Sequence, residues 1–156
     1  MTDTYTVERS TAIKASAESV YARIADFHKW PAWSPWEDLD PDLEQTYSGS
    51  DAGTGAIYEW SGNRKAGQGR MEITDATQPS SVEIALDFLK PFKSSSVTTF
   101  ELAESEETTT VVWSLTGPNT LMLKVMGIFK SMDKMIGPDF EKGLASLKAA
   151  SESSTS

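Results

Sequence analysis

The sequence has no cysteine and a single histidine, His28. Without cysteine there are no disulfides, thiolate zinc ligands or thiol nucleophiles, and one imidazole is too few for metal sites that need two. We therefore expect neither a metal nor another cofactor. Basic residues are also scarce, because 14 Lys and Arg against 23 Asp and Glu give a net charge of −9. An acidic chain repels phosphate backbones, which argues against a nucleic-acid partner.

Long hydrophobic runs are missing as well. The longest, residues 121–129, is far shorter than the roughly 20 residues that a membrane-spanning helix needs, and it contains Lys124. The N-terminus lacks the basic and apolar segments of a signal peptide. We expect a cytoplasmic protein without stable membrane insertion. The length of 156 residues favours a single domain over residues 1–150 and a disordered tail over 151–156, and leaves the oligomeric state open.

The chain alternates between strand patterns and turn signals after one short helix. Residues 3–14 have the composition of a strand, and Ser16 can cap a helix on which Val20, Ile24 and Phe27 share one face. Pro31 limits the tryptophan-rich segment 27–36 to a short helical fragment. Short turns then predict an antiparallel meander. Its six strands are expected at 43–49, 55–62, 67–77, 80–90, 95–104 and 108–117.

Apolar residues recur every three or four positions between residues 120 and 150, which predicts a long amphipathic helix. The pair Gly137-Pro138 should kink or interrupt this helix. The order of elements is therefore strand, two short helical segments, six strands and a long helix. This order is typical of an α+β fold.

Several motifs resemble the polyketide cyclase/dehydrase branch of the START-related (SRPBCC) superfamily. They are WPAWSPW, YSGSDAGTGAIYEW, GQGRMEI, LKPFK, TVVWSLTG and DFEKGLASLK, and the resemblance covers residues 4–150. It implies a helix-grip fold, in which a curved antiparallel sheet of about seven strands wraps around the long C-terminal helix, with two short helices between strands 1 and 2. Such a fold encloses a cavity for apolar ligands. Members of the superfamily bind lipids, sterols or quinones, cyclise polyketides or activate partner proteins.

Rings and thioethers are the candidates for the wall of such a cavity, because methionine and aromatic side chains suit varied apolar shapes. For each of them the alternative is ordinary core packing. The predicted wall consists of Tyr58, Trp60, Met71, Leu86, Phe88, Phe100, Trp113, Met122, Met126 and Phe129. Three tryptophans are expected near the entrance, where they either gate a ligand or fill the open end of the sheet: Trp30, Trp33 and Trp36.

The acid–base candidates near these walls are Glu59, Asp87 and His28. A carboxylate buried among apolar groups can have its pKa raised enough to act near neutral pH. Strand alternation, however, puts Glu59 opposite Trp60 and Asp87 opposite Phe88, so both carboxylates should face solvent. His28 is expected to be a surface or capping residue. All three are weak catalytic candidates.

The dense apolar lining without a convincing acid–base cluster favours binding or transport of a small hydrophobic, lipid- or polyketide-like molecule in an internal cavity. We lean against an enzyme on this pattern. Two alternatives stay open, namely a polyketide cyclase/dehydratase-type enzyme and a protein-partner activator or regulator on the same fold. Five lysines make the final helix locally basic, which suits a helix that lies on a membrane surface or grips a partner helix. The alternative is a core helix whose polar face is solvated.

Overall fold

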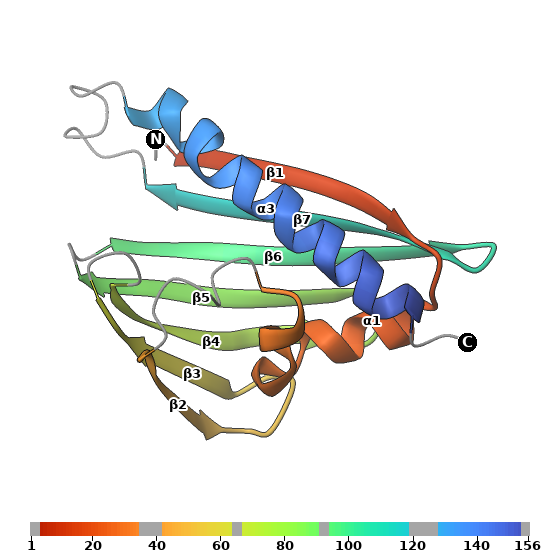
Figure 1. The fold of residues 1–156 in the computed structure, drawn as a ribbon, viewed down its shortest axis with the longest axis horizontal. Helices are drawn as coiled ribbons and strands as arrows, with labels where there is room; N and C mark the ends of the chain where they lie inside the picture. Colours follow the sequence, from red (N-terminus) through yellow and green to blue (C-terminus); the bar gives the residue numbers. More distant parts are fainter. Residues whose placement is uncertain (1–3, 35–41, 64–66, 91–93, 119–127, 154–156) are drawn as a thin grey trace.

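The computed structural model describes residues 4–34, 42–63, 67–90, 94–118 and 128–153. They form a seven-stranded antiparallel sheet, two short helices and one long helix (Figure 1). The helices are α1 (Ala17–Ile24), the 3₁₀ helix η1 (Phe27–Ala32) and α3 (Ile128–Ser153). The strands are β1 (Thr4–Ile13), β2 (Glu44–Gly49), β3 (Ala56–Ser61), β4 (Gln68–Thr77), β5 (Ser81–Lys90), β6 (Ser94–Ser105) and β7 (Thr108–Pro118). The predicted α+β helix-grip fold is confirmed.

The strand order is β1-β7-β6-β5-β4-β3-β2, so every pair of neighbours is consecutive in the chain except β1 and β7. All pairs are antiparallel. Each strand begins and ends within one residue of its prediction. The pairing register shifts twice along β4, after Gln68 and after Ile73, and such bulges bend a strand and increase its twist. Because the strand order begins with β1 and ends with β2, the sheet is open and these two strands are its edges.

The glycine-rich connection between β2 and β3 is a hairpin turn tied to α1. The backbone N–H of Gly53 donates to the carbonyl of Ala25 over 2.8 Å, and that of Gly55 donates to the carbonyl of Ile73 over 2.8 Å. Both glycines have positive φ angles, +70° and +96°, which other residues rarely adopt. The turn thus fixes the β2–β3 hairpin against the end of α1.

The short helices follow their predicted signals. The Ser16 hydroxyl accepts a hydrogen bond from the Ser19 backbone N–H over 3.1 Å, which confirms the cap of α1. Val20, Ile24 and Phe27 are buried, as their spacing indicates. Together α1 and η1 lie beside one end of the sheet (Figure 1).

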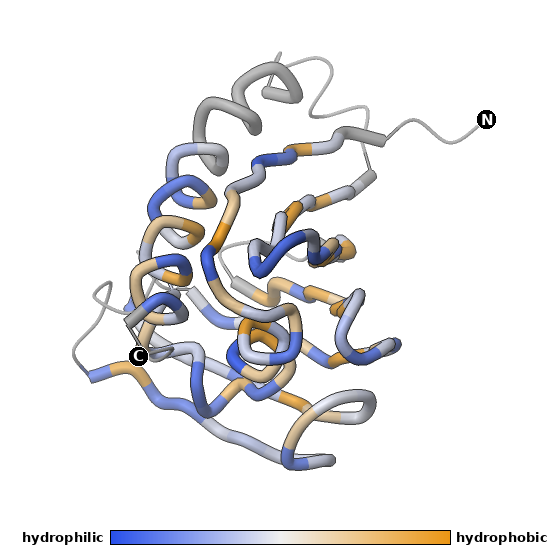
Figure 2. The backbone as a smooth tube through the Cα atoms, turned by 90° about the vertical axis from the view of Figure 1, so that its right-hand side faces the viewer, coloured by the Kyte–Doolittle hydropathy of each residue, from blue (hydrophilic) through white to orange (hydrophobic). Residues whose placement is uncertain are grey.

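The long helix α3 runs diagonally over one face of the sheet, against β1 (Figure 1). Gly137 allows a close approach, because a Cβ atom there would lie 2.2 Å from Nη2 of Arg9. The Arg9 Nε also pairs with Oε2 of Glu141 over 2.9 Å. Figure 2 shows apolar residues gathered where the helices approach the strands.

The helix continues through Pro138, so of the two predicted effects of Gly137-Pro138 the interruption is wrong, and a kink stays a prediction. Packing against β1 through Gly137 and the Arg9–Glu141 pair holds a single helix on both sides of the proline. The helix also extends to Ser153, past the expected end at residue 150, and Ser151 is fully buried. Among the described residues, no helix is long and apolar enough to cross a membrane.

Candidate functional site

Six apolar side chains lie together on the inner face of β2 to β5, which is the face of the sheet against which the helices pack. We call them the aromatic surface: Tyr47, Tyr58, Trp60, Met71, Leu86 and Phe88. The register places Tyr47 opposite Tyr58, Tyr58 opposite Met71, and Met71 opposite Leu86, which makes one row across four strands. Trp60, Gly69 and Phe88 form the next row along the same face.

The rings of the aromatic surface are in contact with one another. The ring centroids of Tyr47 and Tyr58 are 5.3 Å apart, those of Tyr58 and Trp60 5.9 Å, and those of Trp60 and Phe88 5.5 Å. Gly69 lets the indole of Trp60 lie against the sheet, because a Cβ atom at Gly69 would come within 2.4 Å of Cη2 of Trp60. Met71 is buried, whereas the four rings and Leu86 are only half-buried.

Phe100 and Trp113, also predicted for the wall, lie instead in the fully buried core. Their exposed fractions are 0% and 1%. The Trp113 ring stacks on Phe140 of α3 at 3.9 Å and on Phe100 at 4.8 Å. Its indole N–H donates to the hydroxyl of Thr98 over 2.8 Å. Protein rings thus cover this part of the inner face, and contact of Phe100 or Trp113 with a ligand stays a prediction.

Trp30 and Trp33 occupy the positions of core residues rather than of residues at an open mouth. They are 4% and 1% exposed. The indole N–H of Trp30 donates to the carbonyl of Ile24 over 2.9 Å, and that of Trp33 donates to the carbonyl of Arg23 over 3.1 Å. This placement favours the alternative in which they fill the end of the sheet. Gating by either one stays a prediction.

The remaining predicted wall and entrance residues lie outside the described part of the chain. Trp36, Met122 and Met126 belong to segments that the structure does not describe. Phe129 lies in α3, but its side chain is outside the description. The methionine wall expected from the long helix therefore stays a prediction.

Glu59 and Asp87 lie on the outer face of the sheet, opposite the aromatic surface. The register aligns Glu59 with Arg70 and Arg70 with Asp87. Arg70 Nη2 pairs with Oε1 of Glu72 over 2.9 Å, and the Ser95 hydroxyl donates to Oδ1 of Asp87 over 2.7 Å. Neither carboxylate shares a face with Trp60 or Phe88, so neither is placed to act on a molecule bound there.

His28 is the one acid–base candidate that touches the aromatic surface. Its ring stacks on Tyr47 with centroids 4.2 Å apart and planes 21° apart. Its Nδ1 lies 2.8 Å from Oδ1 of Asp26. The adjacent Phe27 contacts Tyr58 at 5.9 Å. Sequence reasoning missed both Tyr47 and Asp26. For Tyr47 a signal was present, because the β2–β3 hairpin pairs it with Tyr58.

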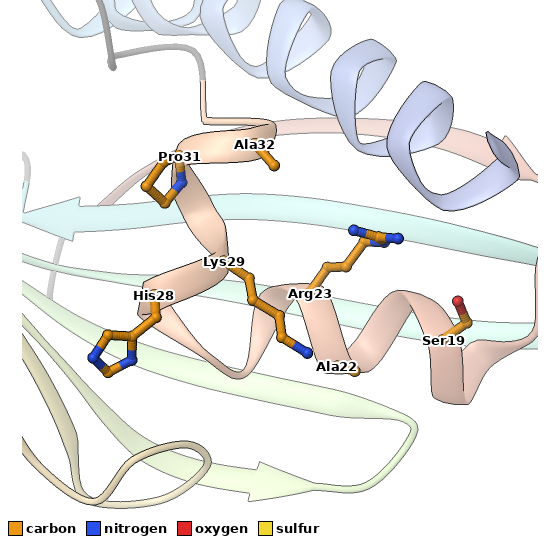
Figure 3. Close-up of a pocket in the computed structure, with 7 residues that line it drawn as sticks. All are labelled: Ser19, Ala22, Arg23, His28, Lys29, Pro31 and Ala32. Atoms are coloured by element: carbon orange, nitrogen blue, oxygen red, sulfur yellow. The ribbon is translucent and has the colours of Figure 1, made fainter. Parts of the chain in front are cut away.

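An open depression of about 540 Å³ lies beside α1 and η1 (Figure 3). Arg23 and Lys29 give it a basic character. Its lining residues are Ser19, Ala22, Arg23, His28, Lys29, Pro31 and Ala32, and of these only His28 was a predicted site residue. In the described part of the chain, no group of three His, Asp or Glu side chains is placed to hold a metal ion.

Comparison with known proteins agrees with this architecture. Residues 4–152 match a family described as polyketide cyclase/dehydrase and lipid transport, which confirms the resemblance seen in the motifs. No curated protein is significantly similar in sequence.

Solved structures share the fold. SA2116 from Staphylococcus aureus superposes with a TM-score of 0.71 at 14% identity, covering 99% of this chain and 97% of that one. CV1439 from Chromobacterium violaceum gives 0.66 at 15% identity, covering 95% and 97%. The Aha1 dimer from Colwellia psychrerythraea gives 0.60 at 19% identity, covering 97% and 98%. At these identities the likeness shows the fold alone.

Proposed function

Because the chain belongs to the polyketide cyclase/dehydrase and lipid transport family, we propose that it binds a small apolar molecule against the aromatic surface. The observation that carries this proposal is the half-burial of Tyr58, Trp60, Leu86 and Phe88 on the inner face of the sheet. We place both the binding and any transport of such a molecule in the cytoplasm.

The aromatic surface is suited to apolar guests because its rings still have area to bury. Folding normally removes large rings on an inner sheet face from water, as it does for Phe100 and Trp113. A guest lying on Trp60 and Phe88 would complete that burial. Covering roughly 100 Å² of apolar surface contributes about 2.5 kcal/mol before the cost of association is subtracted.

Two neighbouring residues of β5 provide a matched test. Phe88 belongs to the aromatic surface, whereas Leu89 lies at the register shift of β5, outside that surface, and is 45% exposed. We expect Phe88→Ser to weaken binding of the uncharged fluorescent probe N-phenyl-1-naphthylamine about tenfold, and Leu89→Ser to leave it within about twofold, because one large apolar contact contributes about 1.5 kcal/mol.

The measurement is a fluorescence titration, with circular dichroism to show that both variants are folded. Equal loss of probe affinity in the two variants would place binding elsewhere. The absence of probe binding by the unmodified protein would contradict the proposed function itself.

A further inference from the structure

His28 is held in a defined orientation at the β2 end of the aromatic surface. Oδ1 of Asp26 accepts from the backbone N–H of His28 over 2.9 Å and lies 2.8 Å from Nδ1 of its ring. The ring of Tyr47 covers one imidazole face. Contacts from a carboxylate and a ring thus fix both the edge and the plane of an imidazole whose side chain is 52% exposed.

The contact with Asp26 determines which of the two ring nitrogens of His28 has the free lone pair. A carboxylate only accepts hydrogen bonds, so the Nδ1–H of a neutral His28 ring points at Oδ1 of Asp26. The lone pair is then on Nε2. Within the described part of the chain, Nε2 makes no hydrogen bond. The ring therefore presents an acceptor.

Ring contacts connect this acceptor to the rest of the aromatic surface. His28 stacks on Tyr47, Tyr47 contacts Tyr58, and Tyr58 stacks on Trp60. In apolar sites a small number of placed polar groups fix the orientation of the ligand. On the described part of the inner face, His28 is a polar group of this kind and lies at the rim of the aromatic surface. Glu59 and Asp87 lie on the outer face of the sheet.

We infer that Nε2 of His28 accepts a hydrogen bond from a hydroxyl group of the guest, with Asp26 as its positioning residue. The ligand class is then an apolar, ring-bearing molecule with a hydroxyl group at one end. This inference rests on the proposed function, because the hydroxyl is presented only when the apolar part lies on the aromatic surface.

Two probes of similar apolar area test the inference, 2-naphthol and 2-methoxynaphthalene. Only the first has an O–H to donate. Titrated at pH 8 by ligand-observed NMR, the unmodified protein should bind 2-naphthol about threefold to tenfold more tightly, the usual effect of one hydrogen bond. His28→Phe keeps a ring against Tyr47 but removes the acceptor. It should abolish the preference while 2-methoxynaphthalene binds within about twofold of the original affinity.

Variants of Asp26 test positioning. Asp26→Ala should reduce the preference for 2-naphthol, because the imidazole loses its hydrogen-bond partner. Asp26→Asn should restore most of it, since the amide oxygen still accepts from Nδ1–H. Lys29→Ala, a change of the exposed neighbour, serves as the control and should leave the preference unchanged.

The outcomes separate the two proposals. Equal binding of both probes by the unmodified protein, or a preference that persists in His28→Phe, would overturn the role of His28 and leave apolar binding in place. Failure of both probes to bind would overturn the proposed function and this inference together.

Discussion

The two halves of the inner sheet face carry similar side chains but differ in what covers them. On β6 and β7, Phe100 and Trp113 are fully buried because Trp33 of the η1 end and Phe140 of α3 lie against them. On β3 and β5, Trp60 and Phe88 contact each other and stay half-buried. We call these the closed half and the open half. The difference arises from helix placement, because the strands of both halves alternate in the same way.

In the described part of the chain, the helices contact mainly β1, β3, β6 and β7. Helix α3 packs on β1, α1 contacts β6 and β7, and η1 contacts β3. Apolar area in the closed half is therefore already used in folding, and its removal should cost stability. Apolar area in the open half is partly unused, and its removal should affect binding more than stability. The same kind of ring thus serves two purposes on one surface.

The largest expected effect is a stability difference between two tryptophans. Trp113→Ala removes a ring stacked at 3.9 Å on Phe140, and we expect a loss of about 3–5 kcal/mol in the free energy of unfolding. Trp60→Ala removes a half-buried ring and should cost about 1–2 kcal/mol. Urea denaturation of both variants measures the difference. Equal losses would show that the open half is an ordinary core and would break the comparison.

A second prediction concerns Gly69, which lies under the Trp60 indole in the open half. In Gly69→Ala the new Cβ would lie 2.4 Å from Cη2 of Trp60 and 2.6 Å from the carbonyl oxygen of Asp87. The indole must move away and the backbone must adjust, which should cost about 1–3 kcal/mol. Because Trp60 is displaced, probe affinity should fall severalfold as well. Urea denaturation and the fluorescence titration measure the two effects, and an unchanged probe affinity would exclude Trp60 from the binding surface.

The sheet was predictable from the sequence because each strand is bounded by strong turn signals. The alternation of Val82, Ile84, Leu86 and Phe88 correctly gave the inner face of β5. The Ser16 cap likewise located the start of α1. These features depend on local patterns, and local patterns set strand and helix ends.

The cover of the inner face was not predictable in the same way. Alternation shows that Trp113 and Trp60 both face inward, but it does not show over which of them a helix lies. Predicting that Trp33 packs in the core required knowing that η1 folds back over Phe100. Tyr47 was missed because its strand, EQTYSG, is otherwise polar, and only its pairing with β3 reveals its place beside Tyr58.

The smallest expected effect concerns the C-terminal end of α3, which lies at β1, the edge strand beside the closed half. The backbone N–H of Lys14, which donates to Oε2 of Glu152 over 2.9 Å, and the Lys148 ammonium together hold the pKa of Glu152 below its ordinary value of 4.5. A lowered folded-state pKa stabilises the protein fully above pH 4.5, and this contribution is lost as the pH falls through the lowered value. Glu152→Gln should therefore lower Tm slightly at pH 7 and converge with the unmodified protein in acid.

Thermal unfolding between pH 7 and pH 3 measures this effect, with Glu101→Gln as the control because Glu101 is an exposed carboxylate on β6. Probe affinity should be unchanged in Glu152→Gln, since α3 is anchored there to the β1 side of the sheet through the Lys148 ammonium and the carbonyl of Ala12, 3.1 Å apart. A Tm difference that is constant across the pH range would contradict the assignment. A change in probe affinity would instead show that the two halves are coupled through α3.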